Sequence, residues 1–286
     1  MADSGRLNNI IRAWEAGRPA FASFAHADRQ TATEFSTAPY DGVVFEMEHN
    51  PWDVTALQDA LQYLLNRKQI VTSGSLAPAV TPIVRIPANG AEKTQSFAKQ
   101  ALDRGVYGVV WPHINDAEQA YNAVAACRYP RKETAEFHEP AGMRGDGPAA
   151  ACRYWGLTQQ EYYTKADVWP LNPQGEILVF IMIESVRAVD NLDDILKKVP
   201  GIGCVLIGEG DLSQELGYPR QYSHPDVEDA MGRVVATCRK HGIPVGHPHV
   251  TSINVERVVA DGYRFIMSAP VRTYDAIQKA REITAV

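Results

Sequence analysis

The sequence predicts a single (β/α)8 barrel, the TIM-barrel fold, over residues 1–286. Three observations lead to this prediction. The chain contains eight short, nearly continuous apolar runs, as in parallel strands that are covered on both faces. Longer amphipathic stretches alternate with these runs, as in repeated β-α units. A chain of 286 residues that is 45% apolar and 22% charged can bury the complete core of one barrel.

The predicted strands extend over the whole chain. They cover residues 19–25, 42–47, 81–87, 107–112, 176–184, 203–208, 243–247 and 263–269. The helix-like segments predicted between them include residues 53–68, 90–105, 116–130, 186–199 and 224–242, and a further helix at 1–19 precedes the barrel. Several of these helices begin with Asp or Asn, which cap free amides, and several end on Gly.

One region does not fit the alternation of strand and helix. Residues 129–175 are rich in Pro, Gly and aromatic residues and interrupt the path between the fourth and fifth strands. A segment of this length predicts a functional loop or lid, with a short helix near residues 158–167.

Composition excludes several classes of function. The net charge is −6 and no basic stripe is present, so nucleic acid is not an expected partner. No apolar run reaches the roughly 18 residues of a membrane span, and residues 1–19 lack the apolar core of a signal peptide. The four cysteines are widely spaced, as expected for reduced structural thiols in the cytoplasm.

Charged residues and histidines follow the predicted strands at the points where the strands end. In a (β/α)8 barrel these carboxyl ends meet at one rim, where the active site lies. Any one of them could be a solvated loop residue, but their number predicts a functional site. They are His26, Glu46, Glu48, His49, Arg85, His113, Glu184, Glu209, Asp211, His247 and His249.

Two of these carboxylates are predicted metal ligands. Glu184 ends the apolar run at 176–184, where a buried carboxylate is costly unless it is paired or bound to a cation. Asp211 follows Gly208-Glu209-Gly210, whose glycines allow a ligand to approach the backbone. Two oxygen ligands suit Mg²⁺ or Mn²⁺, with Co²⁺ as a further option. Asp211 could instead cap a helix, a role that is compatible with metal binding.

The chemistry expected of such a cation concerns 2-oxo acids. A cation with open positions can chelate the carboxylate and keto oxygens of a 2-oxo acid and stabilise its enolate. Arg85 could donate to the developing oxyanion, or alternatively form an ion pair with a barrel carboxylate. His49 is the predicted base because imidazole titrates near neutral pH, and Asp103 is one option for the carboxylate that orients it.

These residues lie within motifs that resemble a known family. They are EMEHNPWD, PIVRIP, ALDRGVYGVVWPHINDAEQA, GMRGDG, IMIESVRAVDNLDDIL and IGEGDLSQELGYP. The chain resembles the metal-dependent pyruvate aldolases typified by 4-hydroxy-2-oxoheptanedioate aldolase, in the HpcH/HpaI aldolase/citrate lyase family. The resemblance implies a class II aldolase that cleaves or forms 4-hydroxy-2-oxo acids from pyruvate and an aldehyde through a metal-bound enolate. It also implies a hexamer, built as a trimer of dimers, with the C-terminal barrel helix exchanged between partners.

The resemblance also implies roles for individual residues. Glu184 and Asp211 match the metal ligands, and Arg85 matches the arginine that stabilises the enolate. His49 and Asp103 match a dyad that moves protons, and the amides of Gly210 and Asp211 match the loop that holds the pyruvate carboxylate.

The sequence departs from the family pattern at three places. Met182 stands where the family usually has Gln, Glu46-Met47 where it has Asp-Gly, and Gly208-Glu209-Gly210 where it has Gly-Pro-Ala. These changes leave the two predicted metal ligands in place.

The aldehyde half of the site is predicted from the remaining rim histidines and the aromatic residues of 129–175. The candidates are His113, His247, His249, Tyr154, Trp155, Tyr162, Tyr163 and Trp169. Gathered at one rim, they would favour a bulky aldehyde with little charge. The alternative is that these aromatic residues pack at subunit interfaces.

Other functions stay open at this point. The same scaffold could carry an oxaloacetate decarboxylase or a citryl-CoA-type lyase, although no basic cluster for coenzyme A phosphates stands near the rim. A hydrolase could bind Zn²⁺ through His247 and His249, which point the same way in an extended segment. A barrel without catalytic activity would leave the rim carboxylates unexplained.

Overall fold

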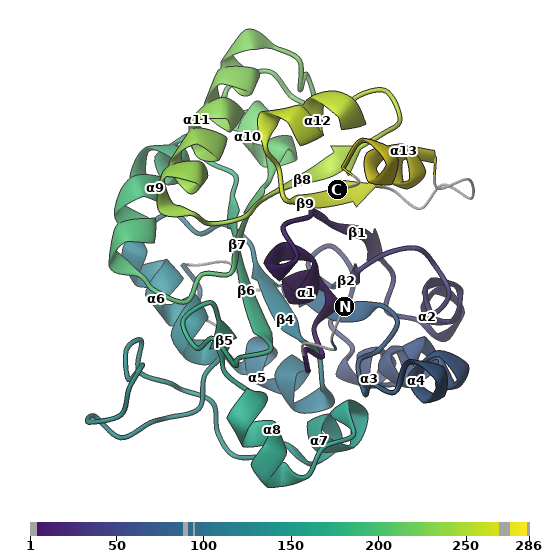
Figure 1. Cartoon of the computed structure of the whole chain (residues 1–286). Coiled ribbons are helices and arrows are strands. Elements are labelled where there is room, and N and C mark those ends of the chain that lie inside the picture. Colours follow the sequence, from purple (N-terminus) through teal and green to yellow (C-terminus); the bar gives the residue numbers. More distant parts are fainter. Residues whose placement is uncertain (1–4, 88–90, 94, 269–274, 285–286) are drawn as a thin grey trace.

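The structure is a computed structural model that describes residues 5–87, 91–93, 95–268 and 275–284. Within these residues eight parallel strands close into a barrel, which confirms the predicted fold (Figure 1). Closure comes from the pairing of β1 with β9 and of β4 with β6. The barrel strands are β1 (Ala20–Ala25), β2 (Gly42–Glu46), β3 (Thr81–Arg85), β4 (Gly108–Trp111), β6 (Ile177–Ile183), β7 (Cys204–Ile207), β8 (Val245–Val250) and β9 (Phe265–Ser268).

The strand bounds agree with the predicted runs except at two places. A two-residue strand, β5 (Val168–Trp169), pairs with β6 and was not predicted. Strand β8 continues to Val250, beyond its predicted end at residue 247, with an irregular register between His247 and Val250. This extension places His249 within the strand.

Helices surround the barrel as an outer layer (Figure 1). Those that follow the barrel strands are α2 (Arg29–Phe35), α3 (Val54–Leu64), α4 (Arg67–Ser73), α5 (Gln95–Arg104), α6 (Ala117–Ala126), α9 (Val186–Lys198), α10 (Glu209–Glu215), α11 (Pro225–His241), α12 (Val255–Asp261) and α13 (Asp275–Thr284). The predicted caps are present: Asp53 and Asp116, for example, accept hydrogen bonds from the first-turn amides of α3 and α6. Among the described residues, none of the helices combines the length and apolar character needed to cross a bilayer.

The N-terminal helix α1 (Asn9–Glu15) covers the amino-terminal end of the barrel (Figure 1). Its Trp14 packs against Phe180 and Phe265, with ring centroids 6.5 and 6.3 Å away. A side chain on Gly42 of β2 would lie 2.6 Å from the Cδ1 atom of Ile10, so the helix sits close against the strands. The amino end is therefore filled, and the carboxyl end is left for a functional site.

The region between β4 and β6 is an ordered excursion rather than a simple lid. After α6 an irregular segment extends away from the barrel at the lower left of Figure 1, and it leads into α7 (Ala149–Trp155) and α8 (Gln159–Lys165). Helix α8 confirms the predicted short helix. The base of the segment is fixed by the buried Arg128, which donates to Asp167 at 2.7 Å and to the carbonyl of Pro140 at 2.6 Å.

The aromatic residues of this excursion build its core, so the expectation that they line the substrate site is wrong for most of them. Trp155 is 1% exposed and stacks on Tyr107, with ring centroids 4.2 Å apart, and Tyr162 packs against Trp155 at 4.9 Å. Trp169 lies 5.8 Å from Trp14 at the amino end of the barrel, opposite the rim. Burial of large apolar rings decides these positions.

The C-terminal helix α13 packs against α12 of the same chain. The residues that lead into it, 269–274, lie outside the described residues. The exchange of this helix between subunits therefore stays a prediction.

Candidate active site

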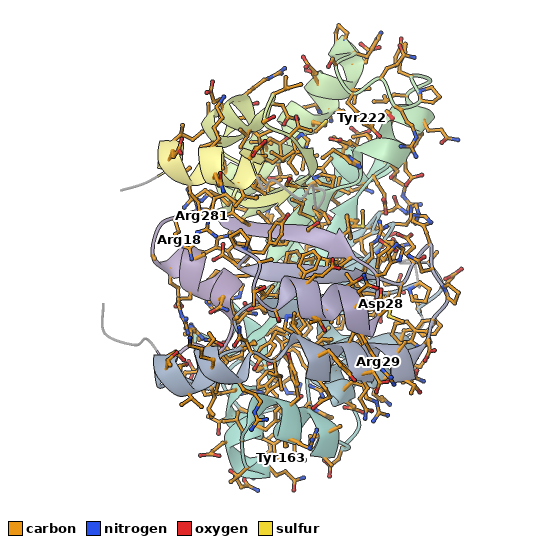
Figure 2. The ribbon with its side chains drawn as sticks, turned by 90° about the vertical axis from the view of Figure 1, so that its right-hand side faces the viewer. Arg18, Asp28, Arg29, Tyr163, Tyr222 and Arg281 are labelled. Atoms are coloured by element: carbon orange, nitrogen blue, oxygen red, sulfur yellow. The ribbon has the colours of Figure 1, made fainter. Side chains whose placement is uncertain are left out.

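Polar residues meet at the carboxyl ends of the barrel strands, as predicted. Figure 2 shows this end on the right, where Asp28 lies just beyond β1 and Tyr222 lies between α10 and α11. Arg18, which precedes β1, and Arg281 lie at the opposite end. The residues at the ends of β2, β3, β4, β6 and β7 form two connected clusters.

The first cluster is built around Arg85 at the end of β3. Glu46 and Arg85 are register partners on β2 and β3, and the Nε of Arg85 donates to Glu46 Oε2 at 2.6 Å. The NH1 group of Arg85 lies 2.9 Å from Glu48 Oε2, and its guanidinium carbon lies 4.6 Å from the ring centroid of Phe24. The arginine is thus held in one orientation by two carboxylates and a ring, which confirms the ion pair that was the alternative for Arg85.

Glu46 also shapes the turn that follows β2. Its Oε1 accepts the backbone N–H groups of Glu48 at 2.8 Å and His49 at 3.1 Å. Burial raises the pKa of Glu48, although the positive charge of Arg85 acts in the opposite direction. The departure from the family pattern at Glu46 therefore has a structural role, because this carboxylate fixes both Arg85 and the turn.

The second cluster surrounds Glu184, which follows β6 and is 3% exposed. The backbone N–H of His113 donates to Glu184 Oε1 at 2.5 Å, and the Nδ1 of His113 lies 3.4 Å from the same oxygen. His113, Glu184 and Asp211 each offer one ligand atom, and these atoms lie within 4.8 Å of one another. The structure thus brings the two predicted metal ligands together and adds His113, which the sequence had assigned only to substrate contact.

Burial raises the pKa of Glu184 to about 7. The neighbouring carboxylates of Glu48 and Asp211 contribute to this rise, whereas His113 opposes it. Close packing keeps the carboxylate in place, since a Cβ on Gly208 would lie only 2.3 Å from Glu184 Oε2. A buried carboxylate among other carboxylates is the environment that a bound cation would stabilise.

Glu48 connects the two clusters. One of its oxygens faces Arg85 NH1, and the other lies 3.7 Å from the Nε2 of His113. Arg85, Glu48, His113 and Glu184 therefore form one continuous polar chain across the ends of β3, β2, β4 and β6.

The predicted pairing of His49 with Asp103 does not occur among the described residues. His49 is exposed, and the carboxylate beside its Nε2 is Glu48, at 3.6 Å. Asp103 lies in the last turn of α5, in the helical layer, and accepts from the buried Arg144 at 3.0 Å. Burial raises the pKa of Asp103 despite this ion pair. The partner of Asp103, Arg144, belongs to the 129–175 excursion, so the pairing could not be predicted from the sequence positions of the two residues.

His249, predicted to contact the substrate, lies on the other face of its strand. Alternation along β8 directs Gly246 toward the barrel interior, where a Cβ would meet Leu206 and Phe265, and directs His247 and His249 toward the helical layer. The Nδ1 of His249 lies 2.6 Å from Glu209 Oε1. Gly210 and Asp211 lie in the first turn of α10 on the rim, where the first amides of a helix have no intrahelical acceptor.

A (β/α)8 barrel with an arginine and a group of side chains that could hold a metal ion at its carboxyl rim is typical of barrel enzymes with their site at that rim. The sequence profile of the HpcH/HpaI aldolase/citrate lyase family matches residues 22–284, and the chain belongs to this family. This result confirms the resemblance found in the sequence.

Individual relatives give the same family and add the reaction class. The chain is 32% identical over 232 residues to the 2-keto-3-deoxy-L-rhamnonate aldolase of Klebsiella pneumoniae, covering 81% of this chain and 74% of that one. It is 31% identical over 229 residues to the 5-keto-4-deoxy-D-glucarate aldolase of Escherichia fergusonii, covering 80% and 77%. Among solved structures it is similar to an HpcH/HpaI aldolase/citrate lyase family protein from Burkholderia cenocepacia, with a TM-score of 0.71, 26% identity and 93% coverage of both chains. The chain is therefore an enzyme of the aldolase and lyase type.

Proposed function

We propose that this protein is a divalent-metal-dependent aldolase that cleaves or forms 4-hydroxy-2-oxo acids from pyruvate and an aldehyde. The observation that supports this most is the group of His113, Glu184 and Asp211 beside the ion pair of Arg85 and Glu48. Such a site suits a 2-oxo acid, because a metal can bind its oxygens while an arginine donates to the oxygen that becomes negative. The aldolase names of the relatives support the same reaction class.

The side chains at the site fit a divalent cation. Glu184 and Asp211 offer carboxylate oxygens, the ligands that Mg²⁺ and Mn²⁺ prefer, and His113 offers a nitrogen more typical of transition metals. The mixed set favours Mn²⁺ or Co²⁺ over Mg²⁺. When bound, the cation would supply Lewis acidity to the keto oxygen of the substrate.

Arg85 is proposed to bind the oxygen that becomes negative during the reaction. Two carboxylates already fix the plane of its guanidinium, so little conformational freedom would be lost on binding. Its NH1 group also faces the sulfur of Met182 at 3.7 Å, and a thioether is a weak acceptor. A substrate oxygen would be a much better partner for this N–H group. Met182, which stands where the family usually has Gln, therefore leaves the NH1 group of Arg85 available to the substrate. The amides of Gly210 and Asp211 are proposed to hold the substrate carboxylate.

Proton transfer is proposed to depend on His49 and Glu48. His49 is open to solvent and lies 3.6 Å from Glu48, which takes the orienting role that the sequence had given to Asp103. Glu48 also faces Arg85 and His113. A proton on Glu48 would therefore lie between the arginine and the side chains proposed to hold the metal.

The test is pyruvate release from a panel of 4-hydroxy-2-oxo acids, coupled to lactate dehydrogenase, with and without a chelator. Glu184→Gln and Asp211→Asn should each lower turnover by at least about 10²-fold, because a carboxylate ligand is lost. Asp194→Asn, at an exposed carboxylate on α9, is the matched control and should behave as wild type. Turnover that resists both the chelator and the two ligand variants would refute the proposal.

The expected assembly and location are also proposals. The family resemblance supports a hexamer, built as a trimer of dimers, and the widely spaced, unpaired cysteines support a location in the cytoplasm. Analytical ultracentrifugation tests the assembly directly, and a monomer at micromolar concentration would contradict it.

A further inference from the structure

Helices α11 and α12 leave a cavity between them on the outer side of β8. Helix α11 packs against α9 and α12 packs against α13, but the cavity between α11 and α12 has a volume of about 560 Å³. Small residues keep it open: Gly232 and Ala236 on α11 and Ala260 on α12 all line it. A Cβ placed on Gly232 would meet no atom within 4 Å. This volume is in the range of small-molecule sites, roughly 300–1,000 Å³.

The strand side of this cavity carries a buried carboxylate. Glu209 is 1% exposed, and its Oε1 is bound to the Nδ1 of His249 at 2.6 Å. Its Oε2 is buried and has no hydrogen-bond partner in the part of the chain that the structure describes. The Nε2 of His247 lies 3.6 Å from that oxygen, which is beyond hydrogen-bond distance.

Beyond the contact with His249, the neighbours of Glu209 within the described residues leave its Oε2 without a hydrogen bond. The Nδ1 of His247 accepts the backbone N–H of His249 at 3.2 Å, and burial lowers the pKa of His247, so its ring is neutral at pH 7. Two arginines also line the cavity, but both are engaged elsewhere. Arg257 donates to Glu228 at 2.7 Å, and Arg239 donates to the carbonyl of Asp261 at 2.8 Å.

An unpaired acceptor at the back of a cavity is costly unless a ligand supplies the missing donor. Apolar side chains of Met231, Val235 and Val258 form another part of the lining, and Tyr222 and Tyr263 contribute rings. The lining thus combines a negative charge, aromatic faces and an aliphatic surface, a combination that favours a cation with a hydrocarbon body.

We propose that this cavity binds an organic ammonium ligand, with its N–H groups donating to Glu209 and its carbon skeleton packed between α11 and α12. The site is distinct from the rim cluster, because Glu209 points to the outer face of β8 while Arg85 and Glu184 lie at the barrel mouth. It does not depend on the proposed aldolase reaction.

The proposal is tested with two probes of nearly equal shape on the full chain. Tyramine carries an ammonium group, and tyrosol carries a hydroxyl in its place. Calorimetry should show saturable 1:1 binding of tyramine, and tyrosol should bind about tenfold more weakly, the size of one charge-assisted hydrogen bond. Glu209→Gln should weaken tyramine binding by a similar factor.

A second variant leaves the carboxylate unchanged. Gly232→Leu should fill the cavity and lower tyramine affinity at least about tenfold, because the ligand's contact area is lost. Aldolase turnover should stay within about twofold of wild type, since Gly232 lies on α11 and is not part of the rim cluster. Asp229→Leu, at an exposed position of α11 outside the lining, is the control and should bind tyramine as wild type does.

Three results would each overturn the proposal. They are the absence of saturable tyramine binding, equal affinity for tyrosol, and undiminished tyramine binding by Gly232→Leu.

Discussion

Gly208→Ala should disable the active site without touching any polar residue. The added Cβ would stand 2.3 Å from Oε2 and 2.5 Å from Cβ of Glu184, where ordinary contacts begin near 3.4 Å. Gly208 has φ −94° and ψ 73°, near the inverse γ-turn conformation that residues other than glycine also adopt, so the backbone itself is not strained by the change. The effect therefore reports only the close approach between residue 208 and the carboxylate.

The expected magnitude follows from that displacement. Glu184 must move by about 1 Å, and a misplacement of this size in a catalytic group costs about 10²-fold in rate. This factor corresponds to about 2.7 kcal/mol of transition-state stabilisation. Overpacking should also lower the free energy of unfolding by about 1–3 kcal/mol.

The assay compares kcat/KM for pyruvate release with the metal dissociation constant, measured calorimetrically for the same preparation. Gly232→Ala is the matched control because its new Cβ meets open space, and it should keep both values. Wild-type metal affinity and kcat/KM in Gly208→Ala would refute the assigned packing and the role of Glu184 together.

Further predictions concern proton transfer, pH and packing. Glu48→Gln should slow turnover by roughly 10²- to 10⁴-fold, as His49→Ala should, with little change in pyruvate binding seen by calorimetry. Asp103→Asn should instead lower the melting temperature and leave kcat within about threefold. A catalytic loss equal to that of His49→Ala would support the original prediction that Asp103 acts with His49. Metal-free protein should lose stability as pH rises from about 4.5 to 7, because burial raises the folded-state pKa of Glu184 and the native state holds the extra proton. Thermal melts at pH 5 and pH 8 measure this loss, and Glu184→Gln should remove that contribution; an unchanged pH slope would contradict the assignment. Trp155→Ala should lower the free energy of unfolding by about 3–5 kcal/mol, measured by urea unfolding, and leave the relative rates for different aldehydes unchanged. Altered selectivity among the aldehydes would show instead that Trp155 contacts the substrate.

The strands could be predicted from sequence because each is a local feature. A strand covered on both faces must be apolar along its length, and the run at Ile177–Ile183 shows this without any knowledge of its neighbours. The rim residues follow from the same argument, since Arg85 and Glu184 stand directly at strand ends. The additional helices α4 and α7 were missed because their stretches lack a strong apolar period.

Pairings between distant segments could not be predicted in this way. Asp103 meets Arg144 through the fold of the excursion, and Trp155 meets Tyr107 just before β4. His249 was assigned to the wrong face because β8 runs three residues further than the apolar pattern suggests, and alternation then directs its side chain outward. Spacing along the sequence does not predict such contacts between distant segments.

The sequence by itself determined the barrel, the order of its strands and the set of polar residues at their carboxyl ends. Apolar periodicity and the geometry of parallel strands are enough for that, since both depend on neighbouring residues only. Only the tertiary structure decided which polar residues meet. It joined His113 to Glu184 and Asp211, placed Glu48 between Arg85 and His113, and turned Glu209 toward a separate cavity. Those partnerships depend on side-chain direction and on packing between segments far apart in the chain, which close into contact only when the barrel forms.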